Sequence, residues 1–244
     1  MKILPTVMVS ICLAGSLDAA CRQALALGMD VSGSVDSQEY RLQLDGLAAA
    51  LLHPEVRDAF LSMPGAPVRL AAYEWSGPED QTLLIEWRDI HDIRDLAAVA
   101  DTLRSTQRTP AEQSTALGDA MLYGAELLDQ QSACWRRTLD ISGDGKSNTG
   151  PDPQDISDTL LSDITLNALV VGADNLAYGD TRHAEIAELS SYFNAFVIHG
   201  MDSFVEVALG FEDFEAAMVR KLKRELSSFA LSSIGTDETV AFAQ

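Results

Sequence analysis

Five oxygen-bearing side chains lie at three points in the chain and could act together. Asp30, Ser32 and Ser34 occupy alternate positions in the segment Asp-Val-Ser-Gly-Ser. Thr115 follows a polar loop, and Asp144 stands between two glycines. Carboxylate and hydroxyl oxygens suit a hard cation such as Mg²⁺ or Mn²⁺, and so small a set cannot displace the whole water shell of the ion. These residues therefore predict a divalent metal site with coordination positions left open.

Simpler structural roles exist for the same residues. Ser114 or Thr115 can cap the helix expected after them, and an aspartate between glycines is usually a turn residue. The capping role is compatible with metal binding. The three segments in this order are far more specific than any one of them alone.

Apolar runs that alternate with amphipathic ones predict the elements that hold these residues. Strands are expected at 24–31, 68–75, 82–87, 137–142, 165–171 and 196–199. Helices are expected at 37–52, 92–103, 115–128, 154–161, 182–191 and 211–229. Strands that alternate with helices throughout one chain indicate an α/β domain with a mostly parallel sheet. Ligands of such domains bind at the carboxyl ends of the strands, where Asp30 and Asp144 fall.

Composition narrows the possible functions. The 244 residues include 17 Lys and Arg against 37 Asp and Glu, a net charge of −20. Such a chain is repelled by phosphate, which argues against nucleic acid and anionic membrane surfaces as partners. The four histidines have no zinc-site spacing. A chain of this length can bury a large core, so neither a metal nor a disulfide is needed merely for folding.

The first 20 residues have the layout of a secretory signal peptide, with a basic start, an apolar run and a small, polar end. The alternatives are an N-terminal strand of the domain or a lipoprotein signal ending at Cys21. Export predicts a periplasmic or secreted protein in which two cysteines remain. No later segment has 18 consecutive apolar residues, so no transmembrane segment is expected in the mature chain. Residues 231–244 lack periodicity and are expected to form a C-terminal tail.

Asp-x-Ser-x-Ser, a Thr at a helix start and Asp-Gly after a strand, in that order, resemble the von Willebrand factor A (vWA) domain and its metal-ion-dependent adhesion site. The resemblance implies that Ser32, Ser34 and Thr115 ligate the ion directly, and that Asp30 and Asp144 act mainly through bound water or by holding the direct ligands. It implies a domain over 21–230 with a doubly wound, mostly parallel six-stranded sheet, one antiparallel edge strand and helices on both faces.

Two positions depart from the family pattern. Gln113-Ser114 replaces a frequent Gly-Gly, and Gly143 replaces a frequent Thr or Ser. Neither change removes a ligand, but both can alter loop geometry. The segments 30–40, 73–77, 134–145 and 211–226 also look like a bacterial group of secreted vWA-like proteins of uncharacterised function.

The resemblance also implies a disulfide. Cys21 lies nine residues before Asp30, and Cys134 lies ten residues before Asp144. Because the two strands are parallel neighbours in the vWA sheet, equal distances back from one metal place both cysteines together at its opposite end. The alternative is two unpaired buried thiols.

Five further residues are weaker candidates for the rim of the site: Glu74, Trp75, Asp119, Lys146 and Asn148. Trp75 can equally be a core residue, Glu74 can cap a loop, and Asp119 can simply be solvated. Asp140 lies inside an expected strand and must find a partner, either an Arg or backbone donors.

The favoured function is a secreted, divalent-metal-dependent protein-binding module that recognises an acidic group on a protein or peptide partner. The alternative is an exported Mg²⁺-dependent hydrolase of phosphate esters. A non-enzyme is favoured, because the sequence has no paired-aspartate arrangement, no phosphate-binding loop with a lysine and no Gly-x-Ser-x-Gly elbow. A third interpretation is a purely structural domain without metal.

Overall fold

One mixed sheet organises the computed structural model, which describes residues 20–156, 158–172 and 182–234. The strand order is β3-β2-β1-β4-β5-β6, and only β3 is antiparallel to its neighbour. The strands are β1 (Gln23–Asp30), β2 (Val68–Trp75), β3 (Gln81–Ile90), β4 (Arg137–Gly143), β5 (Ile164–Val171) and β6 (Val205–Ala208). This is the predicted doubly wound sheet with one antiparallel edge strand.

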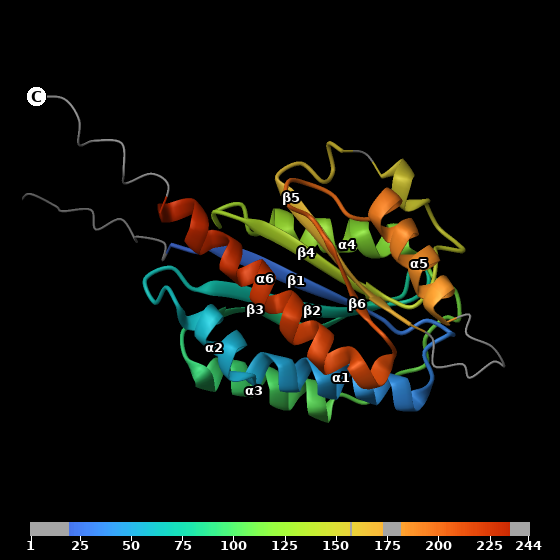
Figure 1. The fold of residues 1–244 in the computed structure, drawn as a ribbon, viewed down its shortest axis with the longest axis horizontal. Helices are drawn as coiled ribbons and strands as arrows, with labels where there is room; N and C mark the ends of the chain where they lie inside the picture. Colours follow the sequence, from blue (N-terminus) through green and yellow to red (C-terminus); the bar gives the residue numbers. More distant parts are fainter. Residues whose placement is uncertain (1–19, 157, 173–181, 235–244) are drawn as a thin grey trace, which may run out of the picture.

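Helices cover both faces of the sheet (Figure 1). The first face carries α1 (Ser37–Leu52), α2 (Pro54–Leu61), α3 (Ile93–Ser105) and α6 (Phe214–Ile234). The second carries α4 (Leu117–Asp129) and α5 (Arg182–Phe196). Successive β1 residues point to opposite faces, so Leu25 and Leu27 enter the first core while Ala24 and Ala26 enter the second.

Two predicted elements differ in the structure. The strand expected at 196–199 is wrong, because α5 continues to Phe196 and the last strand is β6. Val197 is buried in the second core, and His199 makes only an isolated antiparallel bridge to Leu166. In the described part of 154–161, a 3₁₀ turn at Pro153–Asp155 and further turns replace the expected helix. Residues 1–19 of the expected signal peptide and residues 235–244 of the expected tail lie outside the described residues.

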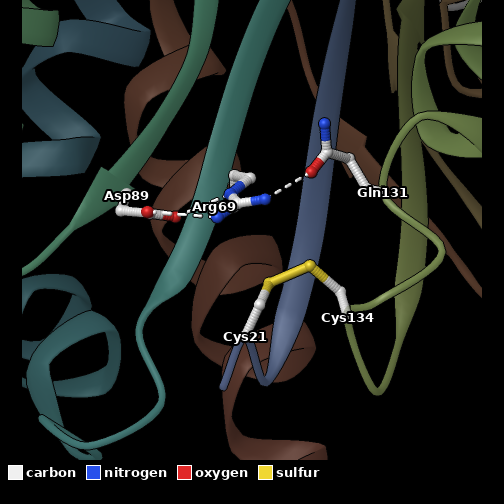
Figure 2. Close-up of a disulfide and its surroundings, with 5 residues drawn as sticks. All are labelled: Cys21, Arg69, Asp89, Gln131 and Cys134. Atoms are coloured by element: carbon white, nitrogen blue, oxygen red, sulfur yellow. Dashed lines mark hydrogen bonds and ion pairs between the residues drawn. A yellow bond between two sulfur atoms is a disulfide. The ribbon is translucent and has the colours of Figure 1, made fainter. Parts of the chain in front are cut away.

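A disulfide joins the segments that precede β1 and β4 (Figure 2), at the end of the sheet opposite to Asp30 and Asp144. Cys21 and Cys134 are bonded across a sequence separation of 113 residues, with their Cα atoms 4.5 Å apart. They continue the β1–β4 register by three residues beyond the Ala24–Arg137 pair. Beside them, the Arg69 guanidinium donates to Asp89 and, at 2.7 Å, to Gln131.

Replacing both cysteines with serine should lower the free energy of unfolding by about 2–4 kcal/mol, because the disulfide closes a long loop in the unfolded chain. Urea denaturation of natively oxidised wild type and of the double variant measures this difference. Reduced wild type should match the variant. Equal stability of oxidised wild type and variant would contradict the stabilising role.

Asp140 pairs with a lysine rather than with the expected arginine or backbone donors. Lys221 of α6 is fully buried, and its Nζ lies 2.7 Å from Asp140 Oδ1 and 2.7 Å from Glu225 Oε1. Asn167 donates to the same Glu225 oxygen at 2.8 Å. Burial raises the pKa of Asp140 to about 7, against the lowering effect of Lys221. This buried ionic cluster fixes α6 to β4 and β5.

Candidate metal centre

Four of the five predicted ligands form one hydrogen-bonded chain. The Ser32 N–H donates to Asp30 Oδ1 at 2.8 Å. The Ser32 and Ser34 hydroxyl oxygens lie 3.3 Å apart, and Ser34 Oγ donates to Asp144 Oδ1 at 2.6 Å. Asp30 and Ser32 are buried, Asp144 is half-buried and Ser34 is exposed. The chain therefore leads from a buried carboxylate to the surface.

The sheet register brings the two carboxylates together. β1 and β4 are parallel neighbours that pair through Met29 and Ser142, so Asp30 and Asp144 leave the sheet at the same edge. The buried Gln43 of α1 links the ends of β1 and β4 by hydrogen bonds. Its Nε2 donates to the Asp30 carbonyl at 2.9 Å, and its Oε1 accepts from the Ser142 hydroxyl at 3.1 Å.

Sequence reasoning missed Gln43 as a positioning residue. The signal was present, because Gln43 lies three residues after Tyr40 and four before Leu47, on the apolar stripe of 37–52. A glutamine on a buried face must find partners for its amide. Here the partners are the backbone and side chain that set the ends of β1 and β4.

Thr115 reaches the same edge through its backbone. Its N–H donates to Asn148 Oδ1 at 2.9 Å, and its carbonyl accepts from the Asn148 N–H at 3.0 Å. Helix α4 begins only at Leu117, after Ala116, and has no side-chain cap. The buried Thr115 side chain is therefore not used as the helix cap. These two hydrogen bonds of Asn148 connect the segment before α4 to the loop after β4.

The two departures from the vWA pattern, at Gln113-Ser114 and at Gly143, both lie in close contact with the segment that carries Asp30. The Gly33 N–H donates to the Gln113 carbonyl at 3.1 Å, and a Cβ at position 33 would lie 2.8 Å from Gln113 Cβ. A residue larger than glycine would push this loop away. At position 143 a Cβ would lie 3.3 Å from Asp30 Oδ2. Glycine there leaves room beside that oxygen.

One oxygen of the buried Asp30 carboxylate, Oδ2, lacks a hydrogen-bond partner among the described residues. Burial, followed by the charge of Asp144, raises the pKa of Asp30 to about 7, although hydrogen bonds from Ser32 oppose the shift. Burial also raises the pKa of Asp144, against the hydrogen bond from Ser34. A divalent cation between these groups would offset both desolvated carboxylates.

The donor chemistry also indicates which kind of ion would fit. Among the described residues, no three His, Cys, Asp or Glu side chains gather in a metal-binding cluster. Two carboxylates and neutral hydroxyls are oxygen donors only, which suits Mg²⁺ or Mn²⁺ better than a soft metal. The residues therefore fit the ion predicted from the sequence.

The weaker candidates have mixed positions. Trp75 is fully buried in the second core, which agrees with the alternative that it is a core residue. Glu74 is also buried and accepts a hydrogen bond from the Tyr40 hydroxyl at 2.5 Å. Burial raises the pKa of Glu74. Neither side chain is open to a ligand at the rim.

Asp119 and Lys146 lie nearer the mouth of the site. Asp119 Oδ2 is buried, and a Cβ on Gly150 would meet it at 1.9 Å, so Asp119 packs against the loop after β4 rather than facing solvent. Lys146 is half-exposed, pairs with Glu188 at 2.5 Å and lies 5.8 Å from the Tyr192 ring centroid. Of the five weaker candidates, Lys146 has the best claim to ligand contact.

Sequence comparison places the chain in a family. Residues 20–230 match the family described as "Protein of unknown function (DUF1194)". The chain belongs to this family. No curated protein matches the chain. The DUF1194 match covers Cys21, Cys134 and all five predicted ligands, and the family description gives no activity.

Solved structures show that this DUF1194 protein has the vWA fold. A von Willebrand factor type A structure from Catenulispora acidiphila is 13% identical, with a TM-score of 0.54 over 85% of this chain and 42% of the other. Proximal thread matrix protein 1 from the mussel byssus, with a zinc-occupied MIDAS motif, is 16% identical, with a TM-score of 0.56 over 86% and 47%.

The pilus adhesin SpaC from Lactobacillus rhamnosus GG is 13% identical, with a TM-score of 0.58 over 86% of this chain and 31% of the adhesin. The DUF1194 chain thus spans half or less of the length of these structures. At such identities the likeness concerns the fold. Within the described part of the chain, no helix has both the length and the apolar character needed to cross a bilayer.

Proposed function

We propose that this DUF1194 protein is an exported, divalent-metal-dependent binding module that recognises an acidic group on a protein partner. Asp30, Ser32, Ser34, Thr115 and Asp144 would hold Mg²⁺ or Mn²⁺ at the carboxyl edge of the sheet. When bound, the ion supplies positive charge and an open coordination position that a carboxylate can fill. The observation that carries the proposal is the buried, unpartnered Asp30 oxygen at the end of the hydrogen-bonded chain to Asp144.

Charge explains why the ion would matter for binding. The chain carries a net charge of −20, so an acidic partner is repelled at long range. A cation at the exposed end of the site would turn this repulsion into local attraction. The pilus adhesin and the byssus matrix protein with an occupied MIDAS motif support a binding role for the same fold.

Export is part of the proposal. Residues 1–20 would be a signal peptide, residues 21–230 the vWA-like domain and residues 231–244 a tail. The Cys21–Cys134 disulfide supports an oxidising compartment, either the periplasm or the exterior. The mature protein would meet its partner there.

Blocked glutamate-containing peptides, with glutamine versions as controls, test the binding role. Wild type should bind the glutamate peptides in Mg²⁺, and binding should be lost in chelator and in Ser34→Ala. Ser105→Ala, which removes an exposed hydroxyl at the end of α3, should bind like wild type. Equal binding with and without chelator would contradict the proposal.

The alternative function is an exported Mg²⁺-dependent hydrolase of phosphate esters, for which the sequence has no paired-aspartate arrangement and no phosphate-binding loop with a lysine. A sweep of phosphatase and esterase substrates tests it. We expect no turnover above background. Robust turnover that is lost in Asp144→Ala would reverse the choice.

Metal affinity should depend on pH. In the absence of metal the Asp30–Asp144 pair holds a proton up to about pH 7, because burial raises the pKa of Asp30 to that value. Binding of the ion must displace this proton, so affinity should fall about tenfold per pH unit below pH 7 and level off above pH 8. Calorimetric Mg²⁺ titrations at pH 5.5, 6.5 and 8.0 measure the slope. An affinity unchanged between pH 8.0 and 6.5 would contradict it.

A further inference from the structure

A cavity of about 210 Å³ opens beside Asp144, and none of its other lining residues is a predicted metal ligand. Its walls come from the loop after β4, the end of β5 and the first turns of α5. The lining residues are Asp144, Lys146, Val171, Gly172, Glu185, Ile186, Glu188 and Leu189. Pockets for whole small-molecule ligands are usually larger, about 300–1,000 Å³. The size suits one long side chain of a partner.

The cavity is apolar inside and acidic at its mouth. Val171 and Ile186 are buried, and Leu189 is half-buried. Glu185 and Glu188 are exposed on α5. A side chain with an aliphatic stem and a terminal charge matches this arrangement, because the stem can cover apolar surface while its charged end stays hydrated.

The sign of that terminal charge follows from the charged lining. Of the three carboxylates in the lining, Glu188 already pairs with the Lys146 ammonium, and Asp144 would face the ion, so Glu185 is the carboxylate left for a ligand. No cation among the side chains that the structure describes pairs with Glu185. An incoming cation would find Glu185 at the mouth, whereas an incoming anion would meet a chain of net charge −20.

We propose that the cavity between α5 and the loop after β4 binds a lysine or arginine side chain of the partner, next to the carboxylate that meets the ion. This inference rests on the proposed metal-dependent function and narrows its partner to a segment with an acidic and a basic residue close together. Such a segment carries no net charge, so its approach is not opposed by the acidic protein.

Blocked peptides with one fixed glutamate and one varied neighbour test the proposal. The neighbour, placed one or two residues to either side, is lysine, arginine, norleucine or aspartate. In Mg²⁺ at pH 8, the best lysine or arginine peptide should bind wild type about tenfold more tightly than its norleucine counterpart. The aspartate peptides should bind most weakly.

Protein variants then test whether Glu185 causes the preference for the lysine or arginine peptides. Glu185→Gln should reduce it to less than about threefold, and Glu185→Lys should favour the aspartate peptides. Both variants should keep the wild-type Mg²⁺ affinity and the wild-type affinity for the norleucine peptide. Glu126→Gln removes an exposed carboxylate from the far part of α4 and should leave the preference unchanged.

The outcomes separate the two proposals. Equal binding of the lysine and norleucine peptides, or a preference that survives in Glu185→Gln, would overturn the cavity assignment and leave the metal-dependent function standing. Failure of every glutamate peptide to bind wild type in Mg²⁺ would overturn both.

Discussion

Lys221→Met should lower the free energy of unfolding by about 3–5 kcal/mol, because it leaves two buried carboxylates without their cation. Lys221 is fully buried between Asp140 and Glu225, at 2.7 Å from each. Urea denaturation at pH 7.5 measures the loss. Lys223→Met is the matched control, since Lys223 lies two residues along α6, is 40% exposed and pairs with the exposed Glu55. Its cost should stay below about 1 kcal/mol.

Neutralising the whole cluster should restore most of the lost stability. The triple variant Asp140→Asn, Lys221→Met and Glu225→Gln removes the cation together with both anions, so it leaves no unpaired charge in the core. If Lys221→Met costs no more than Lys223→Met, the cluster does not hold α6 on the sheet.

Asp30→Asn should weaken Mg²⁺ binding about 100-fold and at the same time stabilise the metal-free protein at pH 8. The carboxylate is buried, one of its oxygens has no hydrogen-bond donor among the described residues, and its pKa is raised to about 7. Asparagine keeps an oxygen for the Ser32 N–H but carries no charge. Calorimetry measures the affinity, and urea denaturation in chelator measures the stability.

The pH dependence gives the sign of the stability change. The folded-state pKa of Asp30 lies above its ordinary value of 3.8, so folding favours the protonated form. Metal-free wild type should therefore lose stability from this group as pH rises from about 4 to 7. Because the pKa of Asp30 rises from 3.8 to about 7, and one pKa unit corresponds to about 1.4 kcal/mol, we expect Asp30→Asn to be more stable by about 3–4 kcal/mol at pH 8, with the advantage gone at pH 4. A variant that is less stable than wild type at pH 8 would contradict this account of Asp30.

Local patterns were enough to predict most of the sheet. Buried runs such as Val68–Trp75 and the capped helix Ser37–Leu52 have the predicted bounds, because they are set by apolar periodicity and by Asp36, whose side chain accepts from two N–H groups. The final strand was misplaced because Val197 and Ile198 form an apolar pair without strand partners. β6 is only four residues long, and its pairing with β5 is a long-range property.

The candidate metal ligands remain a prediction from motif order, but their arrangement can be compared with the structure. Motif order identified Asp30, Ser32, Ser34 and Asp144, which the structure joins by hydrogen bonds. The partner of Asp140 was not predicted, because Lys221 is 81 residues away and looks like one more charge on an amphipathic helix.

Side-chain direction explains why Glu74 and Trp75 do not face the rim of the site. Glu74 and Trp75 end the strand beside β1, yet both are buried below the rim. The sequence predicts that both residues lie at the end of a strand. The direction of each side chain depends on which face of the sheet is covered by which helix.

The central claim is that the described carboxylates and hydroxyls hold one divalent ion. Electron paramagnetic resonance at pH 8 measures free Mn²⁺, and the loss of this signal on adding protein gives the number of bound ions. Wild type should bind one Mn²⁺ per chain, Ser105→Ala should do the same, and Ser34→Ala and Asp144→Ala should bind none at the same concentration. No bound Mn²⁺ in wild type, or one ion retained in both site variants, would contradict the claim.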